Sequence, residues 1–146
     1  MRNLLETARS TGDFTVLIKA IESAGLSDTF KREGQETVFA PNDDAFRKLP
    51  TGTLEGLLKD LPKLQSILNY HVVNRKITLD ELRRMSADGK TPSLMTLQGS
   101  QLVVKTQKNI LMKNEYVNDS KIVKPDIEAS NGVIHTIDRV LIPSSP

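Results

Sequence analysis

The sequence contains no cysteine. This absence excludes disulfide bonds, thiolate metal sites and cysteine nucleophiles, because each of them requires a thiol side chain. It does not identify the compartment, since a domain of this size can be stable without crosslinks. The sequence also lacks an export signal at residues 1–6 and any apolar run near the roughly 18 residues that span a bilayer. We therefore expect a soluble chain that reaches a membrane only through an anchor outside it.

Strong charge of either sign is lacking as well, because 20 basic and 18 acidic residues leave a net charge of +2. The basic residues are scattered and form no stripe, so a nucleic-acid partner is not expected. The sequence has no glycine-rich phosphate loop, no Gly-x-Ser-x-Gly elbow and no His-Glu-x-x-His motif. Its two histidines, His71 and His135, have no carboxylate at a metal-binding spacing. We therefore predict no metal, no cofactor and no catalysis.

The 146 residues with 38% hydrophobic content fit one domain over residues 1–146, with no linker or internal repeat. Apolar residues at helical spacing and capping residues predict helices in the first part of the chain. A short buried strand is expected between them, and alternating strands follow them. The helices are expected over 4–11, 14–24, 26–30, 43–46, 51–59, 60–70 and 79–87, and the strands over 37–40, 94–98, 101–106, 110–112, 116–117, 121–123 and 126–128. This order predicts an α+β fold.

Local signals specify several caps and turns. Asp13 is expected to cap the second helix, and Thr78 with Glu81 forms a predicted capping box. The pair at 99–100 suits a two-residue hairpin, and residues 118–120 suit a second hairpin whose turn type is not specified. Asn118-Asp119-Ser120 also matches a glycosylation sequon on a turn that we expect to be exposed.

Residues 130–142 form the segment around which the fold is expected to be organised. A turn signal, Asn131-Gly132, precedes a run that is apolar on both faces of a strand, which predicts a central strand covered on both sides. Asp138 lies inside it, and a carboxylate buried there must be hydrogen-bonded or paired, because burying an isolated charge is very costly. We expect Asp138 to accept hydrogen bonds from the unit formed by residues 37–46.

Three segments together resemble the fasciclin domain family. They are residues 37–46 (TVFAPNDDAF), residues 70–73 (YHVV) and residues 131–141 (NGVIHTIDRVL), which match two conserved blocks and the Tyr-His segment in the family's order. The resemblance implies a wedge of about seven β-strands with helices packed around it. Within these segments we expect structural roles for Thr37, Asn42, Phe46, Asn131, Gly132, His135 and Asp138.

The resemblance also implies an adhesion or binding module that is secreted or at the cell surface and contacts matrix or cell-surface proteins, or glycans. In a matrix protein of this family, an Asp-Ile pair and the Tyr-His segment are implicated in integrin-mediated adhesion. The residues that match them here are Tyr70, His71, Asp126 and Ile127. Lys124 and Glu128 stand where that protein has an acidic residue and a methionine, which weakens a direct transfer of integrin binding.

Other interpretations stay open at this point. His71 continues an apolar helix face, so it either donates a ring N–H to a backbone carbonyl or contributes with Tyr70 to a ligand surface. Asp43 and Asp44 at a helix start are explained by capping, but a hydrolase would use one of them with a histidine. A structural subunit of a larger surface assembly is a third possibility. The sequence does not indicate an oligomeric state.

Overall fold

The computed structural model describes residues 2–108 and 113–143, and its first part is a set of short helices. Asn3 begins α1 (Leu4–Thr11) through a capping box with Glu6, and Asn42 begins α4 (Asp43–Arg47) by accepting the N–H of Ala45. Asp60 caps α6 (Leu61–Asn69), and the predicted box of Thr78 and Glu81 caps α7. The remaining helices are α2 (Thr15–Ser23), α3 (Ser27–Lys31), α5 (Thr53–Lys59), α7 (Leu79–Met85) and the 3-10 turn η1 (Ala87–Gly89). None of these helices is long and apolar enough to cross a membrane.

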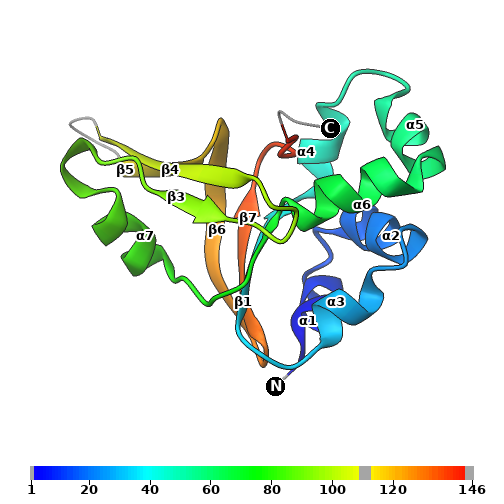
Figure 1. The fold of residues 1–146 in the computed structure, drawn as a ribbon, viewed down its shortest axis with the longest axis horizontal. Coiled ribbons are helices and arrows are strands. Elements are labelled where there is room, and N and C mark those ends of the chain that lie inside the picture. The colour runs from blue at the N-terminus through cyan, green and yellow to red at the C-terminus, as the bar shows by residue number, and fades with distance from the viewer. Residues whose placement is uncertain (1, 109–112, 144–146) are drawn as a thin grey trace.

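The described strands form one seven-stranded sheet in the order β2-β1-β7-β6-β5-β4-β3 (Figure 1). β7 lies in its middle, parallel to β1 and antiparallel to β6. A bridge between Val73 and Thr96 brings the two ends of the sheet together, so the sheet is nearly closed. The strands are β1 (Glu36–Pro41), β2 (Val72–Val73), β3 (Ser93–Met95), β4 (Gln101–Lys108), β5 (Lys113–Val117), β6 (Ser120–Ala129) and β7 (Gly132–Ile137). The expected α+β wedge of about seven strands is confirmed.

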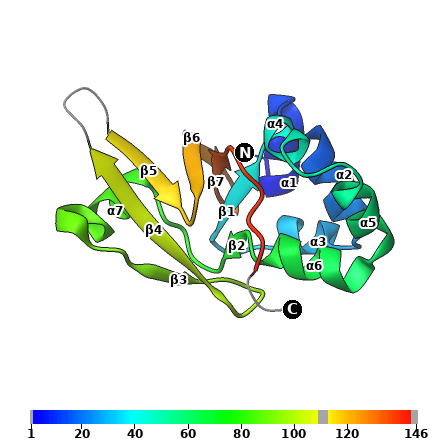
Figure 2. The ribbon, with the colours of Figure 1, turned by 90° about the horizontal axis from the view of Figure 1, so that it is seen from above.

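The central strands separate two hydrophobic cores. Val38, Ala40 and Ile134 pack against the helices α1 to α6, whereas Phe39 and Ile137 face a second core beneath β3, β4 and α7. Figure 2 shows α7 on the side of β3–β5 and the other helices on the opposite side. All six residues of β1 and all six of β7 are buried, because successive side chains of a strand point to opposite faces and both faces are covered.

Four predictions about local structure were wrong or lie outside the described residues. β7 ends at Ile137 instead of continuing to residue 142. β3 and β4 are joined by five residues, 96–100, instead of two, and the N–H and the hydroxyl of Thr96 both donate to the carbonyl of Ser100. Asp13 does not cap α2, whose cap is described below. The strand expected at 110–112 lies outside the described residues, whereas the hairpin expected around 118–120 is confirmed, with a turn of two residues, 118–119.

Candidate partner-binding site

Asn131 joins three segments that are far apart in the sequence. Its Oδ1 accepts the N–H of Leu4 at 2.8 Å, and its Nδ2 donates to the carbonyls of Phe30 at 3.1 Å and Arg32 at 2.8 Å. The side chain is buried, so these bonds satisfy groups that water does not reach. The turn signal in the sequence predicted none of these partners, since the nearest lies 99 residues away in the sequence.

Gly132 is required by its neighbour in the sheet. A Cβ atom built on it would lie 1.9 Å from the carbonyl oxygen of Glu36, and its φ of +156° is one that side chains with a Cβ rarely adopt. The glycine therefore allows β7 to approach β1, in addition to following the turn.

His135 connects β7 to the segment before α7. The N–H of Asp126 donates to its Nδ1 at 3.1 Å, so Nε2 carries the proton and donates to the carbonyl of Ile77 at 2.7 Å. Thr37 holds the same segment, because its hydroxyl donates to the carbonyl of Arg75 and accepts the N–H of Ile77. The ring of His135 stacks on Phe39 with centroids 5.7 Å apart. Burial lowers the pKa of His135, which keeps the ring neutral and both bonds intact.

Tyr70 and His71 are both buried, with exposed fractions of 4% and 2%. The N–H of Leu141 donates to Nε2 of His71 at 2.9 Å, and Nδ1 donates to the carbonyl of Ile67 at 2.7 Å. The hydroxyl of Tyr70 donates to the carbonyl of Gln101 at 3.0 Å. A partner molecule therefore cannot reach either side chain in this structure, and His71 fastens the chain after β7 to the end of α6.

Asn118 accepts the N–H of Val103 at 2.9 Å and donates its amide to the hydroxyl of Tyr70 at 3.0 Å. Its φ is +51°, as a tight two-residue turn requires. The sequence predicted an exposed sequon, but the amide nitrogen that a glycan would occupy is engaged with the protein.

Asp126 and Ile127 lie in an irregular part of β6. The register with β7 shifts twice between Ile122 and Ile127, and Asp126 has a φ of +59°. Such shifts mark β-bulges, which turn side chains away from the regular pleat. We call residues 123–128 the β6 bulge. Ile127 is half-buried, whereas Lys124, Pro125, Asp126 and Glu128 are exposed and Val123 is 42% exposed.

The carboxylate of Asp126 has a structural partner as well as an exposed position. Its Oδ1 accepts the N–H of Leu79 at 2.9 Å, at the start of α7. Together with the main-chain bond to His135, this contact fixes both the backbone and the side chain of Asp126. Of the four expected partner-binding residues, the structure brings Asp126 to the surface, leaves Ile127 partly covered and encloses Tyr70 and His71.

The hydrogen-bond partners of Asp138 differ from the predicted ones. Its Oδ1 accepts the N–H of Lys121 at 2.9 Å and its own N–H donates to the carbonyl of Lys121 at 3.1 Å, so its partner is β6 and not the unit of residues 37–46. Lys48, just beyond that unit, donates to the carbonyl of Asp138 at 2.8 Å. The carboxylate is partly exposed because β7 has already ended, so it does not carry the burial cost that motivated the prediction.

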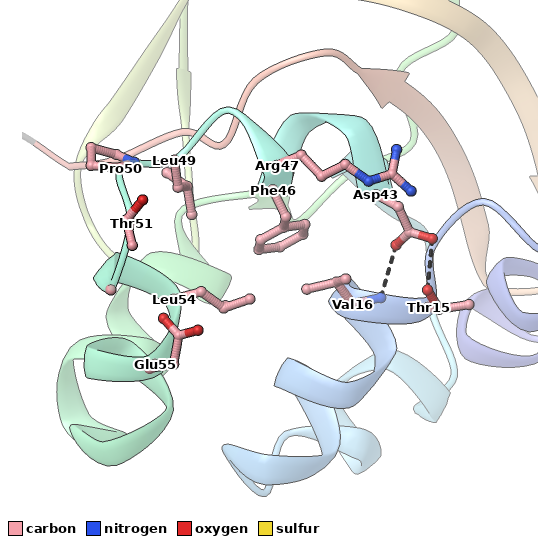
Figure 3. A pocket seen from close by; sticks show the side chains of 11 residues that line it. Thr15, Val16, Asp43, Phe46, Arg47, Leu49, Pro50, Thr51, Leu54 and Glu55 are labelled. Carbon is pink, nitrogen blue, oxygen red and sulfur yellow. Dashed lines mark hydrogen bonds between the residues drawn. The ribbon is translucent and has the colours of Figure 1, made fainter.

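Asp43 caps a helix other than its own. Its two carboxylate oxygens accept the N–H of Val16 at 2.9 Å and the hydroxyl of Thr15 at 2.6 Å, at the start of α2 (Figure 3). Asp44 pairs with Arg47 on the surface. Neither carboxylate bonds to a histidine among the described residues, and both histidine rings already use both nitrogens. Sequence reasoning missed the cap of α2, because no local signal links residues 27 positions apart.

The segments quoted from the sequence are thus the ones that hold the central strands and the β6 bulge together. A family model of the fasciclin domain matches residues 12–143. The chain belongs to the fasciclin domain family.

Known relatives cover three quarters or more of the chain. It is 39% identical over 142 residues to an uncharacterized protein of Synechocystis sp., covering 97% of this chain and 98% of the relative. It is 38% identical to the transforming growth factor-beta-induced protein ig-h3 of Sus scrofa, covering 98% of this chain but 20% of that protein. It is 36% identical to the cell surface glycolipoprotein MPB83 of Mycobacterium bovis, covering 75% of this chain and 44% of MPB83. The chain thus spans one relative almost fully and a minor part of the two others.

A solved structure supports the fold. A FAS1 domain pair from the insect cell adhesion molecule Fasciclin I matches with a TM-score of 0.69 and 20% identity, covering 88% of this chain and 46% of that one. Among these proteins, MPB83 is named as a cell surface glycolipoprotein, and the solved structure comes from a cell adhesion molecule.

Proposed function

We propose that this fasciclin domain is a secreted or cell-surface binding module that contacts partner proteins through the β6 bulge. Its family membership and its cell-surface and cell-adhesion relatives support the class of function. The observation that carries the choice of surface is Asp126, an exposed residue in a left-handed backbone conformation, fixed by both its main chain and its side chain. Non-glycine residues in such conformations cluster at functional sites.

The hydrogen bonds around the β6 bulge would lower the entropic cost of binding. Asp126 is held from below by the buried ring of His135 and from the side by the first N–H of α7. A surface that is already rigid loses little conformational freedom when a partner binds, so more of the contact energy appears as affinity. This gives the structural residues of the domain a role in function without direct contact.

A protein partner fits the exposed groups better than a glycan does. Sugar rings commonly pack on the faces of exposed aromatic side chains, and the chain has four phenylalanines, two tyrosines and no tryptophan. All four phenylalanines and Tyr70 are buried, and Tyr116 is half-buried. The β6 bulge instead offers an aliphatic side chain, Val123, beside charges of both signs, which suits a protein surface.

A non-catalytic role is part of the proposal. A general base must lie within hydrogen-bond reach of the proton that it removes, and the hydrolase alternative would need Asp43 or Asp44 with a histidine. The described contacts of Asp43 are those of a helix cap, and both histidines are buried and neutral. These contacts favour binding over hydrolysis as the function of the chain.

The test is attachment of cells of the source organism to the immobilised chain. Val123→Ser removes the exposed aliphatic contact, and Asp126→Asn removes the charge while keeping an oxygen that can accept the N–H of Leu79. We expect each variant to reduce attachment and the double variant to remove most of it. Ile127 is left unchanged, because it is half-buried and its loss would confuse folding with binding.

The matched controls are Met95→Ser, on an exposed methionine of β3, and Asp119→Asn, on an exposed turn. Both should attach as the unchanged chain does, and all variants should melt within the range of these controls. If the double variant were folded and attached as well as the controls, the β6 bulge would not be the contact surface.

A further inference from the structure

A hollow of about 300 Å³ lies between α2, α4, α5 and the turn that joins α4 to α5 (Figure 3). Val16, Phe46, Leu49 and Leu54 point into it, and Arg47 and Glu55 lie at its rim. We call it the α2–α5 hollow. Its lining includes no residue of β6. It is therefore a surface feature that the proposed β6 contact does not use.

The floor of the α2–α5 hollow is apolar and only partly covered. Phe46 is 8% exposed, and Val16, Leu49 and Leu54 are half-buried, although all four pack against the helical core. The volume is at the lower end of the range of about 300–1,000 Å³ found for ligand pockets, which suits one large side chain better than an extended molecule. Burying such a side chain here would remove apolar surface of both partners from water.

The charges at the rim select the chemistry of the occupant. Asp43 is engaged in capping α2, and Arg47 pairs with Asp44. Glu55, on the first turn of α5, is exposed and makes no ion pair or side-chain hydrogen bond with the described residues. The uncompensated charge beside the apolar floor is therefore negative, and it favours a cation next to the apolar group that enters.

We propose that the α2–α5 hollow is a second contact point for proteins, which takes an apolar side chain that is followed by lysine or arginine in the partner. The apolar side chain packs on Phe46 and Leu54, and the cation lies against the carboxylate of Glu55. This goes beyond the proposed function, because it names a separate surface and the sequence chemistry that the surface recognises.

The test is an NMR titration of the 146-residue chain with short capped peptides at up to about 10 mM. The probe is acetyl-Gly-Leu-Lys-Gly-amide, and the matched peptides replace its lysine by glutamate or its leucine by alanine. We expect the Leu-Lys peptide to shift the amide signals of residues 46–55, and both matched peptides to bind more weakly. Equal shifts from all three peptides, or no shifts at residues 46–55, would overturn the proposal.

Two variants separate the apolar contribution from the charge. Leu54→Phe narrows the hollow and changes the shape of its apolar floor, so it should weaken the shifts at the same peptide concentration. Glu55→Gln keeps the shape but removes the charge, and it should weaken the Leu-Lys peptide about two- to five-fold, as expected for an exposed ion pair. Val123→Ser, on the β6 bulge, should leave the peptide affinity unchanged. Unaltered affinity in Glu55→Gln, or a loss in Val123→Ser, would count against the α2–α5 hollow as the site.

Discussion

Acidification should destabilise this domain through His71 before most carboxylates are protonated. Burial lowers the pKa of His71 from 6.5 to about 4, and its Nε2 can accept the N–H of Leu141 only while the ring is neutral. In the unfolded chain the same ring takes up a proton near pH 6.5. Between these two values the unfolded state binds more protons than the folded state. The free energy of unfolding therefore has its full value above pH 6.5 and decreases as the pH drops toward 4.

The size of the effect follows from these two pKa values. Integrating the difference in bound protons from pH 7 to pH 5 gives a loss of about 1.8 kcal/mol from His71 alone. The slope near pH 5 approaches about 1.4 kcal/mol per pH unit for one proton. His135 adds a loss in the same direction, because burial lowers its pKa too. A domain stable by about 5–15 kcal/mol would lose a measurable share of its stability.

The assay is urea unfolding at several pH values between 7 and 5, a window in which these two histidines are the side chains expected to titrate. His71→Gln should be less stable at pH 7, because it loses the paired ring, and its pH slope should be shallower by about one proton. His135→Gln serves as the matched comparison. If the unchanged chain were equally stable at pH 7 and pH 5, or if His71→Gln kept the full slope, the assigned role of the neutral ring would be refuted.

Three further predictions concern stability in urea. Gly132→Ala should lower the free energy of unfolding by at least about 3 kcal/mol, because its Cβ would lie 1.9 Å from the backbone of β1. Gly99→Ala, with open space around it, should lower it only by the strain of its positive φ, about 1–2 kcal/mol. Equal losses in the two variants would contradict the close approach of β7 and β1. Asp43→Ala should lower the free energy of unfolding by about 1–2 kcal/mol, because α2 loses its cap. Asp44→Ala, which breaks an exposed ion pair, should lower it by less than about 0.5 kcal/mol. A larger loss in Asp44→Ala than in Asp43→Ala would contradict the capping role of Asp43. Thr136→Val should stabilise the domain by about 1 kcal/mol, because the buried hydroxyl of Thr136 has no hydrogen-bond partner among the described residues; a loss of stability would reveal a partner.

Several predictions that depend on neighbours in the sequence were confirmed. Asn42 and Asp60 cap the helices that the sequence assigned to them, and the hairpin expected around residues 118–120 is present, with a two-residue turn at 118–119. In each case the interacting groups are within four residues, so their geometry depends little on the rest of the chain. The five-residue connection after β3 was missed, because Thr96 forms a bridge with Val73, a residue that is distant in the sequence.

The sequence by itself determined the caps of α4, α6 and α7, the central position of β7, the α+β class and membership of the fasciclin domain family. Only the tertiary structure decided which residues a partner can reach. It buried Tyr70 and His71, exposed Asp126 on a bulge held by His135, and gave the cap of α2 to Asp43. These features depend on hydrogen bonds between groups that are distant in the chain, up to 127 residues apart for Asn131 and Leu4. Such partners meet only when the packed cores fix their positions, so no local pattern of residue types records them.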